Sequence, residues 1–302
     1  MHPLIHLGFG IEFHQPAIIA EALAQAAVHA PRDSNYLLAV ERAATEPSSK
    51  TMLQILEEIR ADKELIASVL KDAYLTGQLS LAREHTLKHV KQWTVYQGEL
   101  EKKTAEMIST TVYYTVAAQH PPKQASLTSP NLTFQSTNPL PQVRFDFYFM
   151  HAINSSIFFT TFNAQPWLSE ASKMRLLKFK GYVDLTLYAS QRAPALLADE
   201  ISNYIPAKTE LSQTSWEGVF TRLFAHGDDG HAVKFGRAVA NAKNVVGPYE
   251  GESWARIKGR EWETVANMVV DSVEAPSPGS KWARGVGFDE SWDQFEDRPT
   301  RL

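Results

Sequence analysis

Residues 50–81 read KTMLQILEEIRADKELIASVLKDAYLTGQLSL, and this stretch decides the fold class. Its apolar residues recur at helical spacing: Met52, Leu53, Ile55, Leu56, Ile59, Ile66, Val69, Leu70 and Tyr74. The charged residues fall on the opposite face: Glu57, Glu58, Lys63 and Lys71. Because one turn of an α-helix takes about 3.6 residues, this pattern gathers the apolar side chains along one side. The stretch therefore predicts an amphipathic helix.

Similar signals lie on both sides of this stretch. Residues 15–30 are rich in alanine, with Pro16 in the first turn and Pro31 just past the end, as is typical of a helix. Residues 144–162 are apolar and aromatic, which is compatible with a strand, but their length favours a buried helix. Further helices are predicted at residues 88–118, 169–187, 193–203, 215–224, 230–244 and 253–273.

Two segments do not follow the helical pattern. Residues 120–143 hold five prolines among Ser, Thr, Gln and Asn, with no acidic residue, which predicts a loop or linker. The tail from Ala275 is rich in Gly, Pro, Trp and Asp, so we expect it to be irregular. The fold class predicted is mainly α: a multi-helical single globular domain over residues 1–302, with a proline-rich loop and an irregular C-terminal tail.

Composition excludes several classes of function. The 302 residues include no cysteine, which removes disulfides, zinc–thiolate sites and cysteine nucleophiles. A formal net charge of -4 offers no basic field for nucleic acid or a membrane surface. No apolar run approaches the roughly 20 residues that a spanning helix needs. We therefore expect a cytoplasmic globular protein without nucleic-acid or membrane partners.

Nucleotide-binding motifs are also missing from the sequence. Gly8-Phe9-Gly10 does not continue as a dinucleotide-binding fingerprint, and no strand–glycine loop–helix pattern surrounds it. The sequence therefore gives no support for a Rossmann site.

The sharpest local motif is Gly230-His231-Ala232-Val233-Lys234. Positions three apart share a helical face, so His231 and Lys234 would point the same way. Histidine is a common metal ligand, whereas lysine becomes one only when deprotonated or carboxylated to a carbamate. Spacing alone favours the plainer interpretation, in which His231 caps or packs locally and Lys234 is solvated.

Three other histidines are candidate ligands. His2 and His6 are four apart, so on a helix both could face one metal; otherwise one is buried and the other lies on the surface. His151 lies in an apolar segment, where a lone histidine is usually a hydrogen-bonded core residue. A buried imidazole still needs partners for both nitrogens, and a metal is one of them.

Four blocks, in order, give the chain a resemblance to the questin oxidase-like family of fungi. They are residues 2–24 (beginning HPLIHLGFGIEF), 146–151 (DFYFMH), 228–234 (DDGHAVK) and 287–292 (GFDESW). The resemblance implies an oxidoreductase of secondary metabolism that acts on anthraquinone-type polyketides by Baeyer–Villiger-type ring opening, sometimes with NADPH as reductant. Some relatives resemble non-haem iron oxygenases that hold the metal with histidines and a carboxylated lysine.

Carried onto this sequence, the resemblance implies the metal ligands His2, His151, His231 and Lys234. His6 ranks lower, because relatives tolerate arginine there. Family members also carry an additional N-terminal segment with a histidine-bearing helix. We therefore expect this chain to be N-terminally shortened relative to the family, with one ligand fewer.

The leading hypothesis is an iron-dependent oxidoreductase that uses molecular oxygen to insert oxygen into, or cleave, an aromatic polyketide. Its aromatic residues, 15 Phe, 10 Tyr and 7 Trp, could line an apolar pocket for a planar substrate. Two alternatives stay open. One is an inactive helical paralogue or fragment with a binding role, and the other is a metal-free, NADPH-dependent Baeyer–Villiger-type oxidase.

Overall fold

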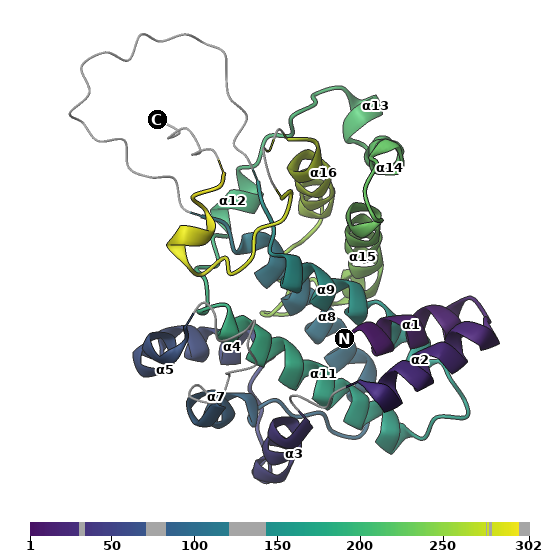
Figure 1. Ribbon diagram of the computed structural model, residues 1–302, viewed down its shortest axis with the longest axis vertical. Helices are drawn as coiled ribbons and strands as arrows, with labels where there is room; N and C mark the ends of the chain where they lie inside the picture. The colour runs from purple at the N-terminus through teal and green to yellow at the C-terminus, as the bar shows by residue number, and fades with distance from the viewer. Residues whose placement is uncertain (30–33, 71–82, 121–142, 276, 278–279, 296–302) are drawn as a thin grey trace.

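The computed structural model describes residues 1–29, 34–70, 83–120, 143–275, 277 and 280–295. Within these ranges the chain is mainly helical and contains no β-strand, which confirms the predicted fold class (Figure 1). The helices are α1 (His2–Glu12), α2 (Pro16–Val28), α3 (Ser34–Ala43), α4 (Met52–Ala61), α5 (Lys63–Ser68), α7 (Arg83–Val90), α8 (Leu100–Ala117), α9 (Phe147–Ser156), α10 (Phe158–Asn163), α11 (Glu170–Ser190), α12 (Asp199–Ser202), α13 (Leu211–Thr214), α14 (Trp216–Ala225), α15 (His231–Val246) and α16 (Glu261–Glu274), with short 3₁₀ helices η1 (Gly247–Tyr249) and η2 (Asp289–Ser291).

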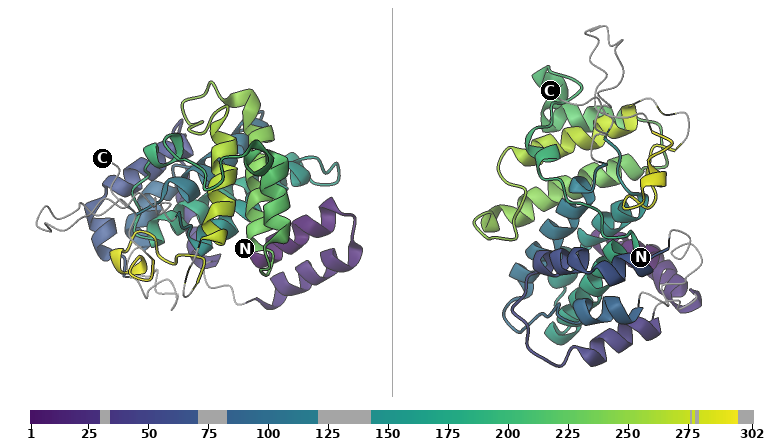
Figure 2. Two further views of the ribbon diagram at one scale, coloured as in Figure 1. Left: turned by 90° about the horizontal axis from the view of Figure 1, so that it is seen from above. Right: turned by 90° about the vertical axis from the view of Figure 1, so that its left-hand side faces the viewer.

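Helix α8 is the centre of the core. Every residue from Thr104 to Ala117 is buried. Helices α9 and α15 pack against it towards one end of the molecule, and α4 and α11 towards the other (Figures 1 and 2). Three of its four threonines, Thr104, Thr111 and Thr115, tolerate burial because their hydroxyls donate to the carbonyl four residues back; Thr115 Oγ1, for example, lies 2.7 Å from Thr111 O.

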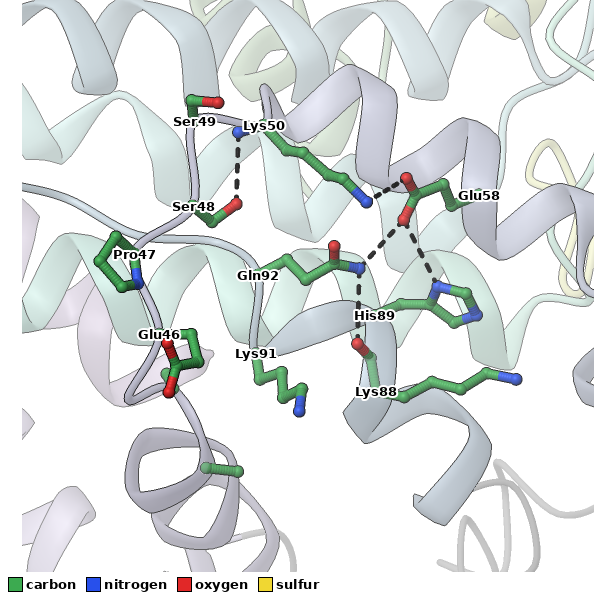
Figure 3. A pocket seen from close by; sticks show the side chains of 12 residues that line it. Glu46, Pro47, Ser48, Ser49, Lys50, Glu58, Lys88, His89, Lys91 and Gln92 are labelled. Atoms are coloured by element: carbon green, nitrogen blue, oxygen red, sulfur yellow. Dashed lines mark hydrogen bonds and ion pairs between the residues drawn. The ribbon is translucent and has the colours of Figure 1, made fainter.

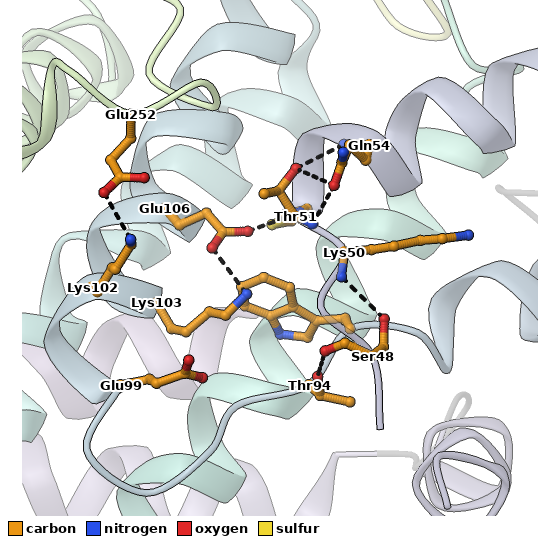
Figure 4. Close-up of polar contacts among 12 residues, drawn as sticks. Ser48, Lys50, Thr51, Gln54, Thr94, Glu99, Lys102, Lys103, Glu106 and Glu252 are labelled. Atoms are coloured by element: carbon orange, nitrogen blue, oxygen red, sulfur yellow. Dashed lines mark hydrogen bonds and ion pairs between the residues drawn. The ribbon is translucent and has the colours of Figure 1, made fainter. Parts of the chain in front are cut away.

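Helix α8 also fixes where α4 begins (Figure 4). The buried carboxylate of Glu106 accepts the N–H of Met52 at 2.6 Å and lies 3.0 Å from Lys103 Nζ. Thr51 and Gln54 form a capping box, each side chain accepting the backbone N–H of the other. The first N–H groups of α4 therefore have partners, and the helix starts close to the predicted position.

The prediction of one continuous helix from residue 50 to 81 is wrong at Asp62. Helix α4 ends there, and the Asp62 side chain accepts the N–H of Leu65 at 3.1 Å to begin α5. A helix-capping side chain satisfies the free N–H groups of a new helix, so it competes with continuation of the old one. Residues 71–81 of this stretch lie outside the described ranges.

Three further helices are shorter than predicted. The 88–118 stretch is interrupted after Val90 and resumes at Leu100, with Gly98 at a φ of 82° between them. In 193–203 only α12 is helical, since Ala193 has positive φ and Pro194 follows. In 253–273 the helix begins only at Glu261. The 144–162 stretch is a buried helix, as predicted, but it is divided at Ile157 into α9 and α10.

The remaining predictions agree closely with the structure. Helices α2, α11, α14 and α15 each lie within three residues of the predicted bounds, 15–30, 169–187, 215–224 and 230–244. Of the predicted loop at 120–143, residues 121–142 lie outside the described part. In the described part of the chain, no helix combines the length and apolarity needed to cross a bilayer.

The N-terminal hairpin of α1 and α2 is held on the core by α1. Helix α1 packs on α10 and α9, while α2 packs on α1 (Figure 1). Contact is close at Gly8, where a Cβ atom would overlap the ring of buried Phe158. This close approach positions the first residues of the chain beside α9.

Candidate functional site

Three histidines from distant parts of the sequence meet at one place. His2 is the first residue of α1, His151 lies in α9, and His231 is the first residue of α15. The ring centres of His2 and His151 are 5.2 Å apart, as are those of His151 and His231. The structure thus brings together three of the four candidate ligands, with His151 in the middle.

Hydrogen bonds orient two of these rings. Nδ1 of His151 lies 2.8 Å from the carbonyl oxygen of Phe147, and Nδ1 of His231 contacts the carboxylate of Asp229. A carbonyl or carboxylate can only accept, so each Nδ1 carries a proton, and in the neutral form of each ring Nε2 would keep its lone pair. This pairing is the usual second partner of a metal-bound histidine.

The loop before α15 sets the position of His231. Asp228 accepts the N–H of Gly230 at 2.7 Å and of Ala232 at 2.9 Å, which fixes the first turn of the helix. Gly230 has a φ of 84°, a conformation that a side chain would strain. The hydrogen bond from His231 lowers the pKa of Asp229. The motif Asp228–Lys234 therefore both begins helix α15 and orients the His231 side chain.

Lys234 lies one turn along the same helix. A methyl group added at Gly230 would be 3.9 Å from Lys234 Nζ, so the amine is close to the start of α15. Its charge also lowers the pKa of His151. Within the described ranges its side chain forms no hydrogen bond or ion pair. The fourth candidate ligand is thus near the histidines and uncommitted to another group.

Burial keeps the central imidazole neutral. Desolvation is the main cause that lowers the pKa of His151 to about 4, and the neighbouring His231, His2 and Lys234 act in the same direction. Burial also lowers the pKa of His2, assisted by the N-terminal amine. A neutral imidazole is the form that binds a metal.

The spacing of the rings suits a shared ion. With a metal–nitrogen bond of about 2 Å, two imidazoles on one metal have ring centres about 5 Å apart. No group of three or more His, Cys, Asp or Glu side chains among the described residues is already arranged as a metal site. The cluster is therefore a set of neighbouring candidate ligands whose spacing suits a metal, rather than a preformed coordination shell.

His6 points elsewhere. Its Nδ1 lies 3.0 Å from Gln25 Nε2 and 3.7 Å from Glu21 Oε1, both on α2. The side chain therefore joins the two helices of the N-terminal hairpin, while His2 faces α9. The structure separates the two histidines that the sequence spacing could have placed on one metal.

Aromatic side chains surround the histidine cluster, and sequence reasoning missed them. The ring of Phe147 is 4.5 Å from that of His151 and 5.2 Å from that of His231, and Trp282 is 6.3 Å from His231. The guanidinium of Arg284 stacks on Phe147 at 4.5 Å. Phe147 could have been found, because it stands four residues before His151 on a helix. Trp282 and Arg284 lie in the irregular tail, where no spacing rule applies.

Asp146 brings this tail to the cluster. Its Oδ1 accepts the N–H groups of Tyr148 and Phe149 at the start of α9, and its Oδ2 accepts those of Gly285 and Val286. Complete burial raises its pKa to about 6. One side chain thus fixes both the helix that carries His151 and the segment that carries Trp282.

A cavity of about 590 Å³ lies elsewhere, between α4, α7 and the chain around Pro47 (Figure 3). Four of its charged or ionisable side chains, Lys50, Glu58, Lys88 and His89, have partners within the protein. Glu58, for example, contacts Lys50 and accepts from Gln92 at 3.0 Å, and His89 lies 2.8 Å from Asp62. None of the candidate ligands lines it. We therefore place the candidate site at the histidine cluster.

Comparison with known proteins gives matches along most of the chain. The family model described as questin oxidase-like matches residues 1–239. A Baeyer-Villiger monooxygenase, dmxR6, from Cryptosporiopsis sp. is 34% identical over 96% of this chain and 64% of its own length. The oxidoreductase AflY of Aspergillus parasiticus and the questin oxidase of Aspergillus terreus are each 32% identical, over 98% and 96% of this chain. The chain spans 63% of the length of each of these two relatives.

Proposed function

Since this chain belongs to the questin oxidase-like family, we propose that it is an oxidoreductase of fungal secondary metabolism. Its reaction is a Baeyer–Villiger-type oxygen insertion or ring cleavage on an anthraquinone-type aromatic polyketide. The names of its relatives support the reaction class, as a Baeyer-Villiger monooxygenase and a questin oxidase. The observation that carries the proposal is the meeting of His2, His151 and His231 with Lys234 inside the matched region.

We further propose that these four residues hold a non-haem iron. The two oriented Nε2 atoms of His151 and His231 support this assignment, as does the neutral state favoured for the central imidazole. Lys234 would join as a neutral amine or, after losing a proton and adding carbon dioxide, as a carbamate whose oxygen suits iron. Bound iron would supply the redox chemistry with which molecular oxygen is used.

The other residues of the site have supporting tasks. The Phe147 carbonyl and the Asp229 carboxylate keep the protons of His151 and His231 on Nδ1, away from the ligand position. Phe147 and Trp282 provide aromatic surface next to the histidines, suited to contact a planar substrate.

The test is metal analysis combined with turnover. The protein is purified, loaded anaerobically with ferrous iron in bicarbonate buffer, desalted and assayed for bound iron and for oxygen uptake with a hydroxyanthraquinone. We expect bound iron in the unaltered chain and its loss in His151→Ala, His231→Ala and Lys234→Ala. His6→Ala is the matched control, because its partners lie on α2, and it should keep the iron.

The alternatives predict different results. Oxygen uptake that needs NADPH but no iron would contradict the metal proposal and support a metal-free oxidase. Iron binding without turnover of any anthraquinone would contradict the proposed activity and support a binding role.

A further inference from the structure

A second cavity, of about 340 Å³, lies where the end of α4, the end of α11 and the C-terminal segment meet. It shares no lining residue with the histidine cluster. In Figure 1 and in the left view of Figure 2, η2 beside it lies on the opposite side of the molecule from α1. Its lining includes Arg60, Arg192, His120, Ile66, Pro194 and Val286. The cavity therefore combines two guanidinium groups with an apolar surface.

Neither guanidinium is neutralised. Arg60 Nη1 donates to the carbonyl of Ala193 at 3.0 Å, and Arg192 stacks on the ring of Phe288 at 5.5 Å. Among the described residues neither forms an ion pair with a carboxylate. The acidic group in the lining, Asp289, is fully exposed and lies 4.0 Å from His120 Nε2. Both guanidinium groups therefore have a fixed contact within the protein, and their positive charges remain available to an anionic ligand.

The backbone beside the cavity is held in a rare conformation. Arg192 and Ala193 have φ values of 60° and 41°, although neither is glycine. Two hydrogen bonds fix the turn. The N–H of Ala193 donates to the carbonyl oxygen of Tyr188 at 3.1 Å, and the Tyr188 hydroxyl donates to the carbonyl oxygen of Pro194 at 2.8 Å. Two consecutive left-handed residues cost energy, and such costs are retained most often where a side chain must be aimed at a ligand.

The C-terminal segment on the other side of the cavity packs closely against this turn. Gly287 lines the cavity, and a Cβ atom there would overlap the backbone oxygen of Gln191 and lie 3.1 Å from Arg192 Cβ. The two walls therefore meet without room for a side chain between them. This close packing makes the cavity a formed feature of the fold.

We propose that this cavity, the Arg60–Arg192 cavity, binds a small carboxylate with an apolar body. Guanidinium groups match a carboxylate in planar, paired hydrogen bonds. The apolar body would lie against Ile66, Pro194 and Val286, and the volume suits a small molecule. The apolar half of the lining favours such a ligand over inorganic phosphate, which would use only the charges.

Calorimetric titration with 2-naphthoate tests the proposal. Its neutral counterpart, 2-naphthylmethanol, has the same ring system without the charge. We expect saturable binding of 2-naphthoate at least tenfold tighter than that of the alcohol. Arg192→Gly removes the charge and is compatible with positive φ, and Arg60→Met keeps the aliphatic stem; each should weaken binding at least tenfold while circular dichroism stays unchanged.

Arg42→Met is the matched control, because Arg42 is also an exposed arginine but lines neither this cavity nor the histidine cluster. It should bind 2-naphthoate like the unaltered protein. Equal binding of acid and alcohol, or unchanged binding in both cavity variants, would overturn the proposal. If inorganic phosphate displaced 2-naphthoate at the same concentration, the proposed contribution of the apolar lining would be contradicted. The measurement needs no iron and no turnover, so its outcome is independent of the proposed oxidase activity.

Discussion

The imidazoles of His151 and His231 lie 5.2 Å apart, although one sits in the middle of α9 and the other begins α15. Each has its Nδ1 engaged by an oxygen from its own helix or the loop before it. Among the residues that the structure describes, Nε2 of neither ring has a hydrogen-bond partner, so both rings bring an unpaired nitrogen to the same place. The relationship suggests experiments on the groups that hold the rings, as well as on the rings themselves.

Replacing Asp229 with Asn should weaken iron binding about 10–100-fold, because an amide no longer holds the proton of His231 on Nδ1 as a carboxylate does. Asp229 is 71% exposed, so stability should hardly change. Iron affinity is measured by competition with a chelator, and Asp289→Asn, also exposed, is the control. Unaltered iron affinity in Asp229→Asn would remove Asp229 from the site.

Adding a methyl group at Gly8 should destabilise the fold by about 1–3 kcal/mol, because the new Cβ overlaps the buried ring of Phe158. Since α1 must then shift, iron binding through His2 should fall as well. Urea unfolding of Gly8→Ala measures the first effect. Gly251→Ala is the control, since nothing lies within 4 Å of a Cβ there. Equal stability of the two variants would show that α1 adjusts freely.

The buried ion pair of Lys180 and Asp184 gives a prediction about the core. Both side chains are buried between α11 and α8, and Thr111 Oγ1 lies 3.0 Å from Asp184 Oδ2. Lys180→Met leaves an uncompensated buried carboxylate, so we expect a loss of about 3–5 kcal/mol in urea unfolding. Combining it with Asp184→Leu should recover most of that loss. If Lys180→Met alone were as stable as the parent, the Asp184 carboxyl would already be neutral in the folded protein.

Acid should destabilise the iron-free protein partly through His151. Its pKa is lowered from 6.5 to about 4 in the folded state, so between these values the unfolded chain binds the extra proton. Stability from this group is complete above pH 6.5 and is lost as the pH falls towards 4, by up to about 3 kcal/mol. Urea unfolding of the parent and His151→Gln at pH 7.5 and 4.5 should show the smaller acid loss in the variant.

Buried carboxylates act in the opposite direction. Burial raises the pKa of Asp146 to about 6, so its contribution to stability is complete below 3.8 and is lost as the pH rises through 6. This effect is common to the parent and His151→Gln, so it cancels in their difference. Identical acid losses in the two proteins would contradict the assignment to His151.

Local sequence determined most of the helices. Apolar spacing and prolines located α2 and α15 closely, because a helix is built from contacts within three or four residues. The apolar spacing did not locate the helix interruptions at Asp62 and Gly98. There a capping side chain or a residue in the left-handed conformation outweighs a continuing apolar pattern. Propensity is a weak signal when a single side chain offers the backbone another partner.

The candidate ligands His2, His151, His231 and Lys234 were also proposed from sequence, through the family resemblance, because spacing alone favoured the plainer interpretation. That they lie together was decided only by tertiary structure: α1 sits against α9 because Gly8 lets it approach Phe158. Trp282 joins the site because Asp146 binds the tail. Such contacts join residues far apart along the chain, and they depend on how whole helices pack, which no local pattern encodes.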